Sequence, residues 1–239
     1  MARHGRIYKD NLEKAKPYGI FLETLRFIED FNSKAANQSY KVGLNQFSDL
    51  TTEECVPRYT GFRATSRSSK SSAATTFKYS MTQVPDSLNW VEKGVVGSIK
   101  DQGECAYEYI AQNHGMTYES NYPYIGVQGT CNERAASIAV ARLKGYENIP
   151  VSEDLLLQAV ARQPQYSGGV FNGPCGENIN HAVAIAGYGK TPDGVDYWLL
   201  KNSWGETWGE KGYMRILRNS GVQGGLCGLV TQATLPVAY

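Results

Sequence analysis

The sequence predicts an α+β fold in which helices and strands occupy separate parts of the chain. Residues 1–61 are rich in charge, and Phe21, Leu25 and Ile28 recur at the i, i+4, i+7 spacing that places them on one face of a helix. Residues 84–239 are rich in Gly, Tyr and Trp and have mostly strand-like patterns. The first block is therefore expected to be helical and the second mainly β.

Residues 62–83 separate these two blocks and are expected to form a linker. They contain a Ser/Thr/Lys/Arg cluster at residues 65–72 and show no hydrophobic periodicity. Such a segment has no apolar face to bury, so it should be exposed and open to proteolysis. We therefore divide the chain into residues 1–61, the linker 62–83 and a main domain at 84–239.

Composition excludes several classes of function. The chain has 239 residues, of which 41% are hydrophobic and 20% are charged, and its net charge is +1, as in soluble globular proteins. Near-neutral charge gives no footprint for nucleic acid or for an anionic membrane. The five cysteines include no CxxC pair, so neither a metal site nor another cofactor is expected. The N-terminus lacks the apolar region of a signal peptide, which would leave the chain in the cytosol if it is translated as written.

Short helices are predicted at residues 106–112 and from Ser152, which is a suitable N-cap. Strands are predicted at residues 181–188, 197–201 and 212–218. A turn rich in Gly, Asp and Pro at residues 189–194 joins the first two strands into a hairpin. In this hairpin His181 begins one strand and Asn202 ends its neighbour, so the two side chains can meet.

Several runs of residues are more specific than these patterns. The run GLNQFSD occupies residues 43–49, VPDSLNW residues 84–90, DQG residues 101–103 and KNSWGETWGEKGY residues 201–213. A further set is spaced along the first helix, at Glu13, Phe21, Ile28 and Asn32. With these runs in this order, the chain resembles the zymogen of a plant papain-like cysteine protease of the senescence-associated type.

This resemblance implies a fold of two lobes behind a helical propeptide, with the active site between the lobes. A helical lobe carries the nucleophilic Cys, and a β-barrel-like lobe carries His and Asn. By the motif match, His181 is the general acid/base, Asn202 orients it, Trp204 covers the His–Asn bond and Gln102 donates to the oxyanion. The substrates implied are proteins and peptides.

The nucleophile that the resemblance requires is missing. The family continues after Gln-Gly with x-Cys-Gly-Ser-Cys-Trp, where the first Cys forms a disulfide and the second attacks the substrate. Here Gln102-Gly103-Glu104-Cys105 is followed directly by Ala106, so Cys105 corresponds to the first Cys. Cys105 precedes His181 by only 76 residues, whereas the family nucleophile lies about 130–150 residues before its His and Asn. We infer an internal deletion after Cys105 that removes the catalytic helix.

A second deletion is inferred after Pro164, where a strand that walls the substrate pocket is absent. The helical lobe is then largely missing, the β-barrel-like lobe is mostly kept, and the propeptide is clipped within its first helix. Apolar faces left without cover predict aggregation or partial folding.

The resemblance also assigns the cysteines. It implies a disulfide between Cys175 and Cys227. Cys105 and Cys131 are each left without the family's partner, although they can pair with each other. Cys55 lies in the propeptide, where a structural buried thiol is expected.

The propeptide departs from its family pattern at Pro17 and Thr24, which replace an Arg and an Asn. A proline inside a helix costs about 3 kcal/mol, unless the helix begins at Pro17.

The sequence as a whole leaves three candidate functions. The first is a member of the papain family of endopeptidases that is inactive because this chain lacks the nucleophilic Cys. The second is a propeptide-type inhibitor of related cysteine peptidases. The third is a protease in which Cys105, at the start of a short helix, is a substitute nucleophile.

Overall fold

The fold was analysed in a computed structural model. It describes residues 8–34, 38–51, 54–55, 83, 85–99, 117–125, 130, 132–138, 140, 143–148, 165–175, 181–231 and 233–238. The predicted site residues Gln102, Cys105 and Cys131 lie outside the described residues, as do both predicted short helices and nearly all of the linker.

Helix α1 spans Asn11–Ser33 and contains the apolar positions predicted from the sequence. Asp10 caps its start, because its Oδ1 accepts the N–H of Glu13 at 2.8 Å. Pro17 lies inside the helix, so the alternative that the helix begins at Pro17 is wrong. Proline has no N–H, so one intrahelical hydrogen bond is lost in the first turns of α1.

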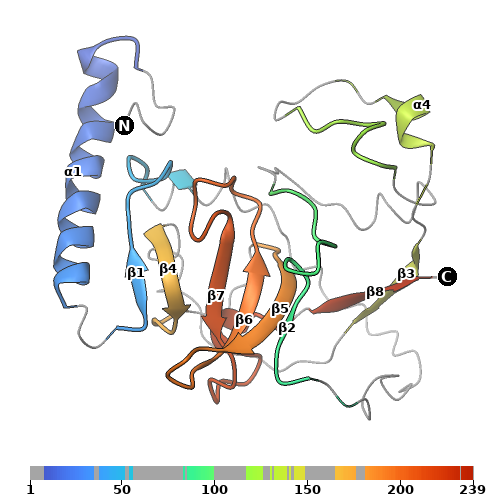
Figure 1. Cartoon of the computed structure of the whole chain (residues 1–239). Helices are drawn as coiled ribbons and strands as arrows, with labels where there is room; N and C mark the ends of the chain where they lie inside the picture. Colours follow the sequence, from blue (N-terminus) through green and yellow to red (C-terminus); the bar gives the residue numbers. More distant parts are fainter. Residues whose placement is uncertain are drawn as a thin grey trace.

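The described strands form a six-stranded sheet in the order β1-β4-β7-β6-β5-β2 and a separate two-stranded ladder of β3 and β8. The strands of the larger sheet are β1 (Tyr40–Val42), β2 (Leu88–Asn89), β4 (Tyr166–Phe171), β5 (Ala184–Lys190), β6 (Asp196–Lys201) and β7 (Tyr213–Leu217). The ladder consists of β3 (Leu143–Asn148) and β8 (Thr234–Ala238), and α4 (Glu133–Ala136) and the 3-10 turn η4 (Leu226–Gly228) complete the elements. Figure 1 shows α1 beside β1 at one edge of the larger sheet, with the ladder beyond its other edge.

The three predicted strands correspond to β5, β6 and β7, which are consecutive antiparallel neighbours. One boundary differs in a way that matters for the site. The prediction that His181 begins a strand is wrong, since β5 begins only at Ala184. His181 therefore lies in the segment that leads into the strand, where its backbone does not follow the ladder.

One hydrophobic core joins the N-terminal block to the sheet. Its largest side chains with under 2% exposure are Trp208, Tyr166, Phe47 and Phe171. The same cluster includes Ile28 of α1, Tyr40 and Val42 of β1, and Cys55, as well as Leu200, Met214 and Ile216 of the central strands. The expectation that Cys55 is buried is confirmed. Residues from both blocks therefore share a single core.

The predicted disulfide between Cys175 and Cys227 is confirmed, with the two Cα atoms 5.1 Å apart. Large apolar side chains are exposed near β2 and on β5, namely Trp90, Val95 and Ile185. Whether such surfaces cause aggregation stays a prediction. Among the helices in the described ranges, none is both long and apolar enough to cross a membrane.

Candidate active site

The imidazole of His181 and the side-chain amide of Asn202 lie 2.8 Å apart, from Nε2 to Oδ1. Asn202 directly follows β6, and His181 precedes β5 by a short segment. These strands pair so that Ala184 lies opposite Lys201. The hairpin therefore brings two residues that are 21 positions apart into hydrogen-bonding distance, as the sequence predicted.

The surroundings of Asn202 fix the direction of this hydrogen bond. Its Oδ1 also accepts the backbone N–H of Ser203 at 2.8 Å, so this atom is the amide oxygen. An oxygen can only accept here, and Nε2 of His181 must therefore be the donor. The other ring nitrogen, Nδ1, carries the lone pair in the neutral imidazole and is the atom able to take up a proton.

Asn202 itself is rigidly held, which makes it suitable for orienting an imidazole. It is 5% exposed, and its backbone N–H donates to the carbonyl of Gly212 at 3.0 Å. That bond ties the end of β6 to the residue that precedes β7. A side chain fixed in this way limits the rotation of the ring that it contacts.

Trp204 stacks on the ring of His181, with the centroids 4.7 Å apart and the planes inclined by 21°. The indole is 4% exposed and meets Trp208 edge-on at 5.0 Å. An aromatic face against the imidazole keeps water from that side of the His181–Asn202 pair. This arrangement agrees with the covering role expected of Trp204.

Burial lowers the pKa of His181 below its ordinary value of 6.5, and the hydrogen bond to Asn202 opposes this effect only in part. The neutral imidazole is therefore the main form at neutral pH. With Nε2 as donor, it presents a basic Nδ1. The pair is thus prepared to accept a proton and to return it, which is the task of a general acid/base.

The N-terminal block reaches this site through Gln46 and Phe47. The amide of Gln46 donates to the carbonyl of Trp204 at 2.5 Å, and its own carbonyl accepts the hydroxyl of Thr207 at 3.3 Å. The ring of Phe47 meets Trp204 edge-on at 5.2 Å. Sequence reasoning identified the run 43–49 as a motif but did not foresee these contacts, because nothing in the run indicates its partner.

The two other predicted catalytic residues lie outside the described residues. Gln102, as oxyanion donor, and Cys105, as substitute nucleophile, stay predictions. Within the described ranges no three His, Cys, Asp or Glu side chains are grouped so that they could hold a metal ion. The described site therefore contains a proton acceptor, His181, whose ring is bound by the amide of Asn202 and covered by Trp204.

The lowered pKa of His181 should link the stability of the chain to pH. Below about pH 6.5 the unfolded chain takes up a proton at this residue that the folded chain resists. The free energy of unfolding should therefore fall as the pH drops from about 7.5 to about 5.5. Urea unfolding of the chain and of His181→Gln, at several pH values, measures this contribution. The difference between the two should shrink toward acid pH, and a difference independent of pH would contradict the assignment.

Comparison with known proteins identifies the family of this chain. The model of the papain family of cysteine proteases matches residues 106–237, and that of the cathepsin propeptide inhibitor domain matches residues 1–55. The senescence-specific cysteine protease SAG12 of Arabidopsis thaliana is 35% identical over 303 aligned positions, which cover 99% of this chain and 88% of the relative. Fruit bromelain of Ananas comosus is 32% identical, over 99% of this chain and 84% of the relative.

Solved structures give the same result. A recombinant stem bromelain precursor superposes with a TM-score of 0.82 at 31% identity, covering all of this chain and 96% of the other. Digestive procathepsin L2 from Tenebrio molitor gives a TM-score of 0.80 at 27% identity, covering 99% of this chain and 96% of the other. This chain therefore belongs to the papain family of cysteine proteases and carries that family's propeptide inhibitor domain.

Proposed function

We propose that this chain is a papain-family protein that has kept the proton-transfer half of the active site and lost its nucleophile, so that it does not hydrolyse peptide bonds at the rate of its relatives. The observation that carries the proposal is the direct continuation of Gln102-Gly103-Glu104-Cys105 into Ala106. No second Cys follows where the attacking thiolate belongs.

The length of the alignments supports an internal deletion. The 303 positions aligned with the Arabidopsis relative exceed the 239 residues of this chain by 64. At least that many alignment positions therefore have no residue in this chain. A loss of this size can accommodate the helix that would carry the nucleophile.

Three cysteines lie within the part of the chain that the structure describes, and none of the three offers a replacement. Cys175 and Cys227 are joined in a disulfide, which removes both thiols from nucleophilic chemistry. Cys55 is buried in the core shared with the propeptide. Without a thiolate beside Nδ1 of His181, no acyl-enzyme can form, and the general base has no proton to remove from an attacking group.

The corresponding prediction concerns turnover. Loss of a catalytic nucleophile typically lowers turnover about a millionfold, so the purified chain should show no family-level cleavage of peptide or protein substrates. The assay uses a fluorogenic peptide series under reducing conditions, with fruit bromelain as the active reference. Cleavage by the chain that disappears in Cys105→Ala would show that Cys105 is a working nucleophile and would overturn the proposal.

A second candidate function is inhibition of related cysteine peptidases by the propeptide domain. It is favoured by the contacts of Gln46 and Phe47 with Trp204, because a relative with the same tryptophan presents a similar surface. Pro17 inside α1 counts against it, since that helix has lost a hydrogen bond.

The inhibitor candidate predicts slow, tight inhibition of a related peptidase by a polypeptide of residues 1–83. Phe47→Ala should weaken this inhibition, because it removes the ring that contacts the indole. Glu23→Ala, which changes an exposed side chain of α1, is the matched control and should leave inhibition unchanged. Absence of inhibition by the unsubstituted polypeptide at micromolar concentration would eliminate the candidate.

A further inference from the structure

Asn202 is held by the turn at residues 209–212, which precedes β7. The backbone N–H of Asn202 donates to the carbonyl of Gly212 at 3.0 Å, and the N–H of Gly212 donates to the carbonyl of Trp208 at 2.7 Å. Gly212 therefore connects the residue that orients His181 with the segment that leads into the turn. The orientation of the peptide group of Gly212 determines where the backbone of Asn202 lies.

The backbone of this turn has an unusual conformation. Gly209, Lys211 and Gly212 have φ values of +56°, +55° and +85°, in the left-handed region that residues with a side chain rarely adopt. A backbone of this kind persists only where the surrounding structure holds it. The contacts that the turn makes with other segments therefore fix the carbonyl to which Asn202 binds.

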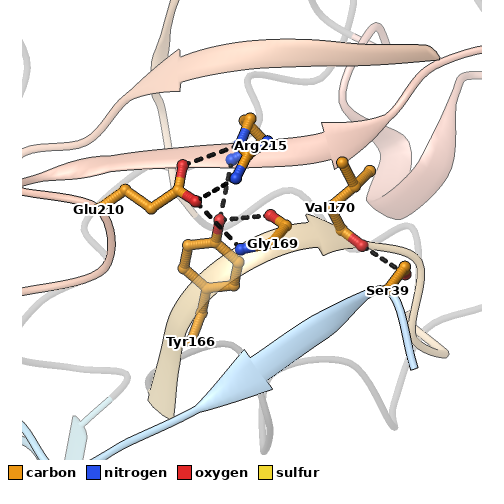
Figure 2. A network of polar contacts seen from close by, with 6 residues as sticks. All are labelled: Ser39, Tyr166, Gly169, Val170, Glu210 and Arg215. Carbon is orange, nitrogen blue, oxygen red and sulfur yellow. Dashed lines mark hydrogen bonds and ion pairs between the residues drawn. The ribbon is translucent and has the colours of Figure 1, made fainter. Parts of the chain in front are cut away.

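The middle of the turn is held through the side chain of Glu210, as Figure 2 shows. Its carboxylate accepts hydrogen bonds from Nε and an Nη of Arg215 at 2.9 Å and 2.6 Å, and from the N–H of Gly169 at 3.0 Å. The backbone N–H of Arg215 donates in turn to the hydroxyl of Tyr166 at 3.2 Å. A two-pronged ion pair is strongly directional, so this Glu210–Arg215–Tyr166 support fixes the position of Glu210.

The end of the turn is held by Ile99, which lies more than a hundred residues earlier in the chain. A Cβ at Gly212 would lie 2.6 Å from both Cγ1 and Cγ2 of Ile99 and 3.0 Å from its Cδ1. The half-buried side chain of Ile99 therefore fills the space that a side chain at position 212 would need. Its two γ carbons pack directly against the backbone of Gly212.

The segment that carries Ile99 is also anchored to the end of β6. Nζ of Lys201 donates to the carbonyl of Gly97 at 2.8 Å, and Lys201 directly precedes Asn202. The segment therefore contacts the chain next to both ends of the Asn202–Gly212 hydrogen bond. Because these two contacts are made with the neighbours of the imidazole and not with the ring itself, their effect on the ring must pass through Asn202.

We propose that Ile99 is a positioning residue for the proton acceptor of the site. Its two γ carbons hold Gly212 in place. The carbonyl of Gly212 holds Asn202, and the amide oxygen of Asn202 holds the Nε2–H of His181. This inference rests on the proposed role of His181 as proton acceptor, and it holds whether or not the chain has a working nucleophile. The segment continues toward Gln102, so the base is tied to the part of the chain in which the oxyanion donor is predicted.

The exchange of the Nε2–H of His181 with water, measured by NMR on the full chain, tests this series of contacts. The signal is assigned by its absence in His181→Gln. Ile99→Leu keeps the number of carbon atoms but has only one γ carbon, so it should raise the exchange rate about five- to tenfold, the effect of losing one hydrogen bond. Ile99→Val keeps both γ carbons and should leave exchange slow, although its side chain is smaller.

Two controls separate positioning from general destabilisation. Val95→Ala shortens a side chain of the same segment that is 68% exposed, and it should leave the exchange rate unchanged. The backbone N–H of Arg218, which binds a carbonyl at the start of β6 at 3.0 Å, should exchange at the same rate in every variant. Equal rates at His181 in Ile99→Leu and Ile99→Val, or equal acceleration at Arg218, would overturn the proposal. Fast exchange of the Nε2–H in the unsubstituted chain would instead refute the pairing of His181 on which the proposal rests.

Discussion

The packing of Trp204 is the contact on which the rest of this structure depends. One face of the indole stacks on His181, while Phe47 from the N-terminal block and Trp208 from the peptidase domain meet it edge-on. Aromatic pairs in these geometries contribute beyond the area they bury. The same side chain therefore belongs to the site, to the core of the sheet and to the attachment of the propeptide.

This shared packing explains how the larger sheet holds an ordered His–Asn pair. Asn202 is fixed by Ser203 and Gly212, and His181 is fixed between Asn202 and Trp204. None of these contacts comes from the block inferred to be missing. Geometry for proton transfer is thus retained by local packing and hairpin register, and it is not by itself evidence of turnover. A catalytic cycle needs in addition a thiolate, the component that we propose this chain has lost.

Patterns within short stretches of sequence predicted much of the fold and part of the candidate site. The apolar spacing in α1, the β5–β6 hairpin and the proximity of His181 to Asn202 follow from local periodicity and turn residues. The Cys175–Cys227 disulfide was implied only by the family resemblance. The pairing of β1 with β4 could not be predicted, because a three-residue strand has no usable periodicity and its partner lies over a hundred residues away. The Glu210–Arg215–Tyr166 support was missed for the same reason, since each residue alone has the pattern of an ordinary strand or turn residue. The start of β5 was misplaced because the apolar residues between His181 and Ala184 continue the strand pattern although the ladder has not begun.

The central claim is that no thiol of this chain is activated by His181. The most direct measurement is treatment of the full chain with an epoxide inhibitor of thiol proteases such as E-64, which is bound to bromelain in a solved structure, followed by peptide mass spectrometry. The account predicts no adduct on Cys105 at a concentration that labels bromelain completely. An adduct on Cys105 that forms in the chain and is lost in His181→Ala would contradict it, because it would show that His181 activates a nucleophile after all.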